Sequence, residues 1–248
     1  MLKTLLRFAT CVLVILVGSI CIYAQKSLLA DTNANLRNKE LKSVRIKGQG
    51  LARLFTDLSL SYDIPVGLEM ASNDNDFDTY EINLEKGTLT ELLDQFARHN
   101  TQYSWEINDG VVNIFPKDGY REFGLAEILK VRISEFSIKE KTSCWEFVDS
   151  LIGTPEVQNI LKTYGMTRSG LNFSGAYFPQ LGPEFRLEAT NKTLKTILNT
   201  VVKESPLAKI WVIKKYRSNQ TFYLSLNARM QNFSTNNSYT FQEEPGAK

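Results

Sequence analysis

The chain has 248 residues, which is enough for one or two ordinary domains. Its content of 43% hydrophobic and 23% charged residues is typical of a folded chain, and it excludes a disordered tail protein, a collagen-like repeat and a protein with several membrane spans. The formal net charge is only +2, and Lys3 and Arg7, near the amino terminus, account for it. Because a nucleic-acid-binding protein normally carries a clear basic excess, we expect no nucleic-acid partner.

The amino terminus has the pattern of an export signal. Residues 1–7 carry two positive charges and no acid, residues 8–23 are almost wholly apolar, and Ala24 is a small residue at the expected cleavage site. The sequence therefore predicts a signal peptide over residues 1–24 and a periplasmic or secreted protein. An uncleaved inner-membrane anchor stays open as an alternative, because Ile22 is larger than the residue that cleavage favours. The apolar run is, however, shorter than the span of about 20 residues that a membrane helix needs.

Cysteine usage gives no sign of a disulfide framework. Cleavage after residue 24 would leave Cys144 as the only cysteine of the mature chain. A single thiol cannot form an internal disulfide, so we expect none. We expect Cys144, which precedes Trp145, to be a small buried side chain.

The first predicted unit covers residues 41–117 and follows a polar, aperiodic stretch, 25–40, that is predicted to be a linker. Val44 and Ile46 alternate with polar residues, which predicts a strand. Apolar residues then recur at helical spacing from Leu51 until the helix ends before Pro65.

The remainder of this unit has three clear local signals. Residues 80–84 alternate between apolar and polar and predict a half-buried strand. Thr88 and Glu91 have the spacing of a capping box, which predicts the start of a helix. Residues 103–107 and 111–115, separated by an Asn-Asp-Gly turn, predict a hairpin.

The second half, residues 131–226, repeats this plan with different residues. Residues 193–205 align with 88–100 without a gap, and their apolar residues fall in the same places. Such self-similarity indicates duplicated supersecondary structure, and convergent patterning is the alternative. Three other segments complete the division of the chain: a linker at 118–130, an insert at 153–182, and a polar tail at 227–248 that is predicted to be disordered.

Three stretches of the first unit resemble the short domain at the amino terminus of secretins and of signalling TonB-dependent receptors. They are a helix, turn and strand at 58–66 (LSLSYDIPV), a strand, glycine and helix at 80–93 (YEINLEKGTLTELL), and a closing hairpin at 103–114 (YSWEINDGVVNI). Residues 131–226 look like a diverged second copy. The predicted fold class is therefore α+β, with two tandem small βαβ-type modules whose helices pack on short sheets.

Members of this family are recognition domains, so the resemblance implies a non-enzymatic binding or scaffolding protein of the bacterial envelope. Its expected partner is an envelope protein: a secretion channel, a receptor or a membrane regulator. We expect no cofactor and no small-molecule substrate. Sheet edges and hairpins would bind the partner by strand addition, and the hairpin residues Asn113 and Lys117, expected to be exposed, would tune partner choice. The alternative is a module that relays a signal between an outer-membrane receptor and an anti-sigma-type regulator.

Candidate catalytic chemistry is sparse. His99 is the only histidine, and it lies in the last turn of a predicted helix, where a cation complements the helix dipole. No nucleophile motif accompanies it. We therefore predict no catalytic residue, although an enzyme whose site is assembled from Asp, Glu, Ser or Tyr side chains stays open as a third interpretation.

One acidic stretch has part of the spacing of a calcium loop. Asp74, Asp76 and Asp78 alternate, and Glu85 falls at the last ligand position. Thr79 stands where that loop needs glycine, and a strand follows where the loop needs a helix. We therefore predict a solvated turn and no metal site.

Charge is divided unevenly between the two units. Residues 63–94 hold nine acids and one base, whereas residues 186–217 hold eight bases and two acids. Opposite fields can dock two units against each other or recruit different partners, and two ordinary solvated faces are the alternative.

Overall fold

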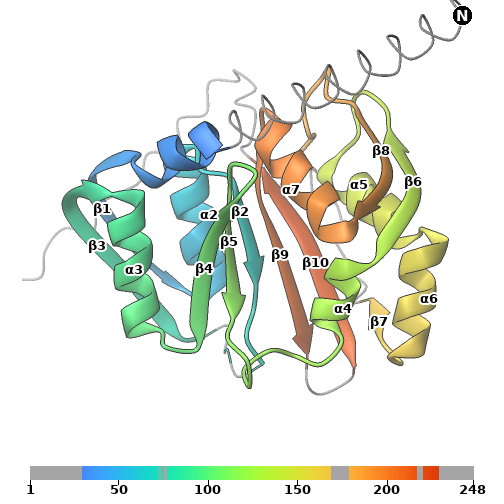
Figure 1. The fold of residues 1–248 in the computed structure, drawn as a ribbon, viewed down its shortest axis with the longest axis horizontal. Coiled ribbons are helices and arrows are strands. Elements are labelled where there is room, and N and C mark those ends of the chain that lie inside the picture. The colour runs from blue at the N-terminus through green and yellow to red at the C-terminus, as the bar shows by residue number, and fades with distance from the viewer. Residues whose placement is uncertain (1–29, 73, 75–76, 169–178, 217–219, 229–248) are drawn as a thin grey trace, which may run out of the picture.

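The structure, a computed structural model, describes residues 30–72, 74, 77–168, 179–216 and 220–228. Residues 30–37 are helical, and the helices that follow are α2 (Leu51–Tyr62), α3 (Leu89–His99), α4 (Leu125–Lys130), α5 (Cys144–Ile152), α6 (Pro155–Thr163) and α7 (Leu194–Glu204). The strands are β1 (Glu40–Gln49), β2 (Val66–Glu69), β3 (Thr79–Thr88), β4 (Tyr103–Asn108), β5 (Val111–Pro116), β6 (Arg132–Ile138), β7 (Thr167–Arg168), β8 (Leu187–Thr193), β9 (Ala208–Tyr216) and β10 (Thr221–Ala228) (Figure 1). The predicted α+β class is confirmed.

Side-chain caps fix where three of the helices begin. Thr88 and Glu91 form the predicted capping box at the start of α3, and Ser143 and Glu146 form another at the start of α5. Thr193 caps α7 with its hydroxyl, as Thr88 caps α3. These hydroxyls accept hydrogen bonds from backbone N–H groups that the first turn of a helix otherwise leaves without partners.

The strands form a six-stranded sheet in the order β4-β5-β2-β9-β10-β7 and two separate two-stranded sheets, β1-β3 and β6-β8. In the first half, β4 and β5 form the predicted antiparallel hairpin, and β5 pairs in parallel with β2. In the second half, β9 and β10 are antiparallel, and β10 pairs in parallel with β7. The strand order β4-β5-β2 thus corresponds to β9-β10-β7. A duplication of the sequence itself stays a prediction.

The two halves are joined in one sheet, where the sequence predicts separate short sheets. β2 of the first half pairs in parallel with β9 of the second half, from Val66 opposite Ile210 to Glu69 opposite Ile213. Main-chain pairing therefore runs without a break from one half to the other (Figure 1).

Two hydrophobic cores lie on opposite faces of the six-stranded sheet. Ile210 and Val212 of β9 belong to the core that contains the buried residues of α2 and α3. Trp211 and Ile213, which alternate with them, belong to the core that contains those of α5 and α7. Because successive side chains of a strand point to opposite faces, the helices of the first half cover one face and those of the second half cover the other. Figure 1 shows α7 in front of the sheet.

Both predicted linkers contain helices that pack against these cores. Residues 118–130 include α4, three of whose side chains are buried. Residues 25–40 include the helix at 30–37, and Leu36 packs against the core of the first half. These helices are too short to produce a clear period in the sequence, which is why the patterns indicated linkers.

Other predicted segments fall partly or wholly outside the described residues. The signal peptide at 1–24 lies outside them, as do 229–248 of the predicted tail. β10 continues to Ala228, beyond the predicted start of the tail at 227. The insert at 153–182 contains α6 and β7, and its residues 169–178 lie outside the described part. Within the described ranges, no helix has the length and apolar character needed to cross a membrane.

Candidate functional site

The junction between β2 and β9 is built around one glycine and one tryptophan. Gly67 of β2 lies opposite Trp211 of β9. A Cβ atom added to Gly67 would come within 2.4 Å of Cε2 in the tryptophan ring. No larger residue fits beneath the ring where it stands, so this position restricts which strand can lie beside β9.

A chain of buried polar groups continues from this tryptophan. Trp211 Nε1 donates to Asn199 Oδ1 at 2.8 Å, and Asn199 Nδ2 donates to Asn113 Oδ1 at 3.2 Å. Asn113 Nδ2 in turn donates to the Val111 carbonyl at 3.1 Å. The chain connects β9, α7 and β5, and so crosses from the second half to the first. Such hydrogen bonds count for more in a low-dielectric interior, where an unpaired polar group is costly.

On the face of the six-stranded sheet opposite Trp211, α2 connects the first half to β9. The Ser59 hydroxyl is buried, with its Oγ 2.7 Å from the Ile64 carbonyl oxygen and 2.8 Å from the Lys209 carbonyl oxygen. Lys209 Nζ lies 3.4 Å from Asp63 Oδ1. This ion pair links a base of the second half to an acid of the first half.

Glu69, the last residue of β2, is a buried carboxylate at the same junction. It is 4% exposed, and its Oε1 lies 3.0 Å from Arg121 Nε. Burial raises the pKa of Glu69, and the nearby charges of Arg121 and Lys195 lower it by less, so the pKa stays above its ordinary value. The ionisation of Glu69 is therefore linked to the packing of the junction.

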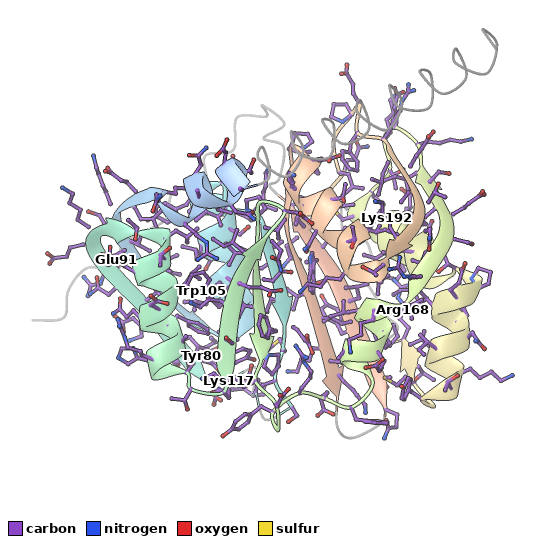
Figure 2. The ribbon with its side chains drawn as sticks, viewed as in Figure 1. Tyr80, Glu91, Trp105, Lys117, Arg168 and Lys192 are labelled. Atoms are coloured by element: carbon purple, nitrogen blue, oxygen red, sulfur yellow. The ribbon has the colours of Figure 1, made fainter. Side chains whose placement is uncertain are left out.

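Trp105, on the edge strand β4 of the first half, corresponds to the buried Trp211 of β9. β4 has the place in its hairpin that β9 has in the second half, and it is the first strand of the six-stranded sheet. Trp105 Nε1 donates to Asp94 Oδ1 at 3.1 Å. Counted from the capping threonine, Asp94 has the same position in α3 that Asn199 has in α7. Trp105 is only partly buried, and Figure 2 shows it on β4, on the side of α3.

The outer edge of β4 presents main-chain groups that β5 does not use. Lys117 N donates to Gln102 O at 2.8 Å, which sets the phase of the β4–β5 ladder. Because alternate residues bond to the partner in an antiparallel pair, Ser104 and every second residue after it bond to β5. Trp105 and Ile107 direct their N–H and C=O groups to the outer edge. No other described strand pairs with that edge.

The helix at residues 30–37 lies next to this edge. The Arg37 guanidinium is 5.7 Å from the centroid of the Trp105 ring, which is within the range of a cation–π contact. The Thr90 hydroxyl donates to the Arg37 carbonyl at 3.0 Å, and the Gly110 N–H donates to Asn33 Oδ1 at 2.8 Å. This helix thus contacts α3 and the turn of the β4–β5 hairpin.

Asn113 and Lys117, the two residues that the sequence placed at a partner-binding surface, differ in their exposure. Asn113 was expected to be exposed, and this expectation is wrong: the side chain is 1% exposed, because α7 of the second half covers its face of the sheet. Lys117 is exposed just beyond β5, as expected (Figure 2). The role of Lys117 in partner choice stays a prediction.

The two candidates for thiol and imidazole chemistry lie where the sequence predicted them. Cys144 is 4% exposed at the start of α5, and burial raises the pKa of its thiol to about 12. It therefore stays protonated at neutral pH and is a poor nucleophile. His99 is exposed in the last turn of α3, with Nδ1 2.8 Å from the Gln95 carbonyl oxygen.

The described residues of the acidic stretch lack the arrangement of a calcium loop. Asp74 accepts hydrogen bonds from the Tyr80 hydroxyl at 3.0 Å and from the Tyr103 hydroxyl. Glu85 lies on β3, and Asp76 is outside the described residues. Among the residues that the structure describes, no group of three His, Cys, Asp or Glu side chains could hold a metal ion.

The chain was compared with models of protein families, with curated proteins and with solved structures, and none of these comparisons finds a match. The resemblance to the secretin and receptor domain therefore depends on the residue patterns given above.

Sequence reasoning missed Gly67, Asn199 and Trp211 as a connected group. One signal could have indicated them. The two helices with a threonine cap, α3 and α7, carry an Asp or Asn at the same position, and each is followed by a tryptophan in the next strand. The two tryptophans are one position out of step in the alignment of the halves, which hid the relation.

Proposed function

We propose that this protein is a non-enzymatic exported envelope protein that binds polypeptide partners, as a binding or scaffolding module. The observation that supports this function is the junction itself. Within this molecule, the edge of one three-stranded unit holds a parallel strand that belongs to another unit. Strand addition to a sheet edge is a recurring mode of protein recognition, because main-chain hydrogen bonds supply affinity and side-chain contacts supply specificity.

The outer edge of β4 is the place where such a partner would bind. It corresponds to the β9 edge that β2 occupies, and it presents the main-chain groups of Trp105 and Ile107. Exposed edge strands are templates for pairing with another chain, and proteins usually cover or blunt them unless they are used. The resemblance to periplasmic domains suggests the partner class: a secretion channel, a receptor or a membrane regulator.

Photocrosslinking in the native cell tests this function. A benzoylphenylalanine residue would replace Ser104 or Asn108 of β4 in separate variants, and the exposed Lys162 of α6 in a control variant. We expect the two β4 variants to form a covalent adduct with the same protein, identified by mass spectrometry, and the control variant to form none with it. Folded β4 variants that give no protein adduct, or adducts identical to those of the control, would contradict the proposal.

The identity of the captured protein separates the two forms of the function. A secretion channel or its accessory subunit supports a scaffolding role. A membrane-anchored regulator supports the alternative, in which the module relays a signal from an outer-membrane receptor.

A further inference from the structure

We infer that the outer edge of β4 accepts a parallel strand with a glycine opposite Trp105, in an extended segment that is free of acids. This inference rests on the proposed function and specifies the chemistry of the partner at that site. The equivalent junction inside the same chain provides the reasoning.

The two edges correspond in their main chain. β9 and β4 are each the first strand of an antiparallel hairpin, and each is preceded by a helix with a threonine cap. β2 adds to β9 in parallel, on the edge that faces away from the hairpin partner β10. The corresponding edge of β4 faces away from β5, and the analogy with β2 makes an incoming strand parallel to β4.

The two edges also correspond in their tryptophans. An Asn or Asp at the same helical position holds each indole N–H: Asn199 holds Trp211, and Asp94 holds Trp105. At the occupied edge, the ring covers Gly67 of the added strand and leaves no room for a Cβ atom. A strand that enters beside Trp105 meets a ring held from the same side, so it also needs glycine at the opposite position.

The charge beside the β4 edge shows what else this edge selects. At the β4 edge, the indole N–H of Trp105 donates to the acid Asp94. At the occupied edge, the indole N–H of Trp211 donates to the neutral Asn199. Residues 63–94, which include most of α3, hold nine acids against one base. Like charges repel across an interface, so a segment without acids is favoured.

A synthetic peptide tests this inference on the full chain. The probe copies residues 62–71 with D63S and E69S, which removes its acids and keeps Gly67. Amide chemical shifts and hydrogen exchange of Trp105 and Ile107 report binding at the β4 edge. We expect saturable binding, slower exchange at these two amides, and an affinity at least about tenfold lower for the same peptide carrying Gly67→Val, because overpacking beneath a fixed ring is unfavourable.

Two controls make the outcome specific. A peptide N-methylated at Leu68 keeps its side chains but loses a main-chain donor, and we expect it to bind more weakly. The protein variant Trp105→Pro removes an outward N–H without removing a bond to β5, and proline is tolerated at such edge positions. We expect this variant to keep its far-ultraviolet circular dichroism, which reports secondary structure, and to lose peptide binding.

The results distinguish failure of this inference from failure of the proposed function. Equal affinity for the glycine and valine peptides, or shifts confined to residues away from β4, overturns the inference. If no peptide binds while crosslinking at β4 still captures a protein in the cell, the inference is wrong and the proposed function stands. If neither experiment gives binding at β4, both are wrong.

Discussion

At the scale of single residues, Gly67 determines how the two halves meet, because it has no side chain. Gly67 is not in a left-handed backbone conformation, so its backbone would tolerate a side chain. The space above it is filled by the Trp211 ring, whose indole N–H is fixed by Asn199. The requirement for glycine is therefore one of packing, and it can be tested by adding one methyl group.

We expect Gly67→Ala to lower the free energy of unfolding by about 1–3 kcal/mol, because the added Cβ forces the buried ring to move. Gly48→Ala is the matched control: the added Cβ would meet Arg53 Cγ at 3.7 Å, an ordinary contact. That control should change the free energy by less than about 1 kcal/mol. Urea unfolding measures both, and equal effects would show that the ring does not constrain position 67.

The burial of Glu69 gives the junction a pH dependence whose sign follows from the raised pKa. Because burial raises its pKa in the folded state, its contribution to stability is complete below the ordinary value of 4.5 and is lost as the pH rises through the folded pKa. We expect Glu69→Gln to be more stable relative to the parent at pH 7 than at pH 4. Unfolding by urea at the two pH values measures the difference, and a difference that does not change with pH would contradict the raised pKa.

Glu146 supplies a contrast of opposite sign. Its hydrogen bonds from the Ser143 N–H and hydroxyl lower its pKa, so its contribution is present above the ordinary value of 4.5 and is lost as the pH falls. Glu146→Gln should therefore be less stable relative to the parent at pH 7 than at pH 4. A common trend in both variants would point to a global effect of pH.

At the scale of elements, buried amides connect pieces that lie far apart in the sequence. Asn113 of β5 and Asn199 of α7 belong to different halves, and their hydrogen bond is buried. A buried polar group that loses its partner is unfavourable by more than the bond itself contributes, so the two amides depend on each other.

We expect Asn113→Leu and Asn199→Leu each to lower the free energy of unfolding by about 1–3 kcal/mol, because each leaves a buried polar partner unsatisfied. The double variant should be destabilised by less than the sum, since it removes both partners of one bond. A double-mutant cycle in urea measures this coupling, and Asn113→Leu combined with the remote Lys162→Ala should be additive. Additivity of the asparagine pair would contradict the coupling.

The elements were predictable from the sequence where their signals are local. The capping box at Thr88 and the turn at Asp109 and Gly110, both with positive φ, are determined by neighbours along the chain. The pairing of β2 with β9 has no such signal, because alternating apolar residues allow many partners. The burial of Asn113 follows from that pairing, since it places α7 over the face that the isolated first unit would leave in water.

At the scale of the whole molecule, each half covers a face of the sheet that the other half would leave bare. α2 packs with Ile210 and Val212 of β9, and α7 covers β2 and β5 from the opposite side. The unequal charges of the two halves left open docking by opposite fields, recruitment of different partners, or two ordinary solvated faces. The observed contact between the halves consists mainly of main-chain pairing and apolar cores. Ion pairs add to it.

We therefore expect the two halves to unfold in one cooperative transition and to keep their separation in salt. The ion pairs Lys209–Asp63 and Lys195–Glu106 have partners that are 57% and 40% exposed. Pairs of this kind contribute about 0–1 kcal/mol each, and salt screens them, whereas strand pairing and apolar burial persist. Small-angle scattering at low salt and at about 1 M salt should give the same radius of gyration, since the Debye length falls to only about 3 Å at the higher concentration. A radius that grows with salt would show that charge holds the halves together, and two separate unfolding transitions in urea would contradict the single cooperative transition.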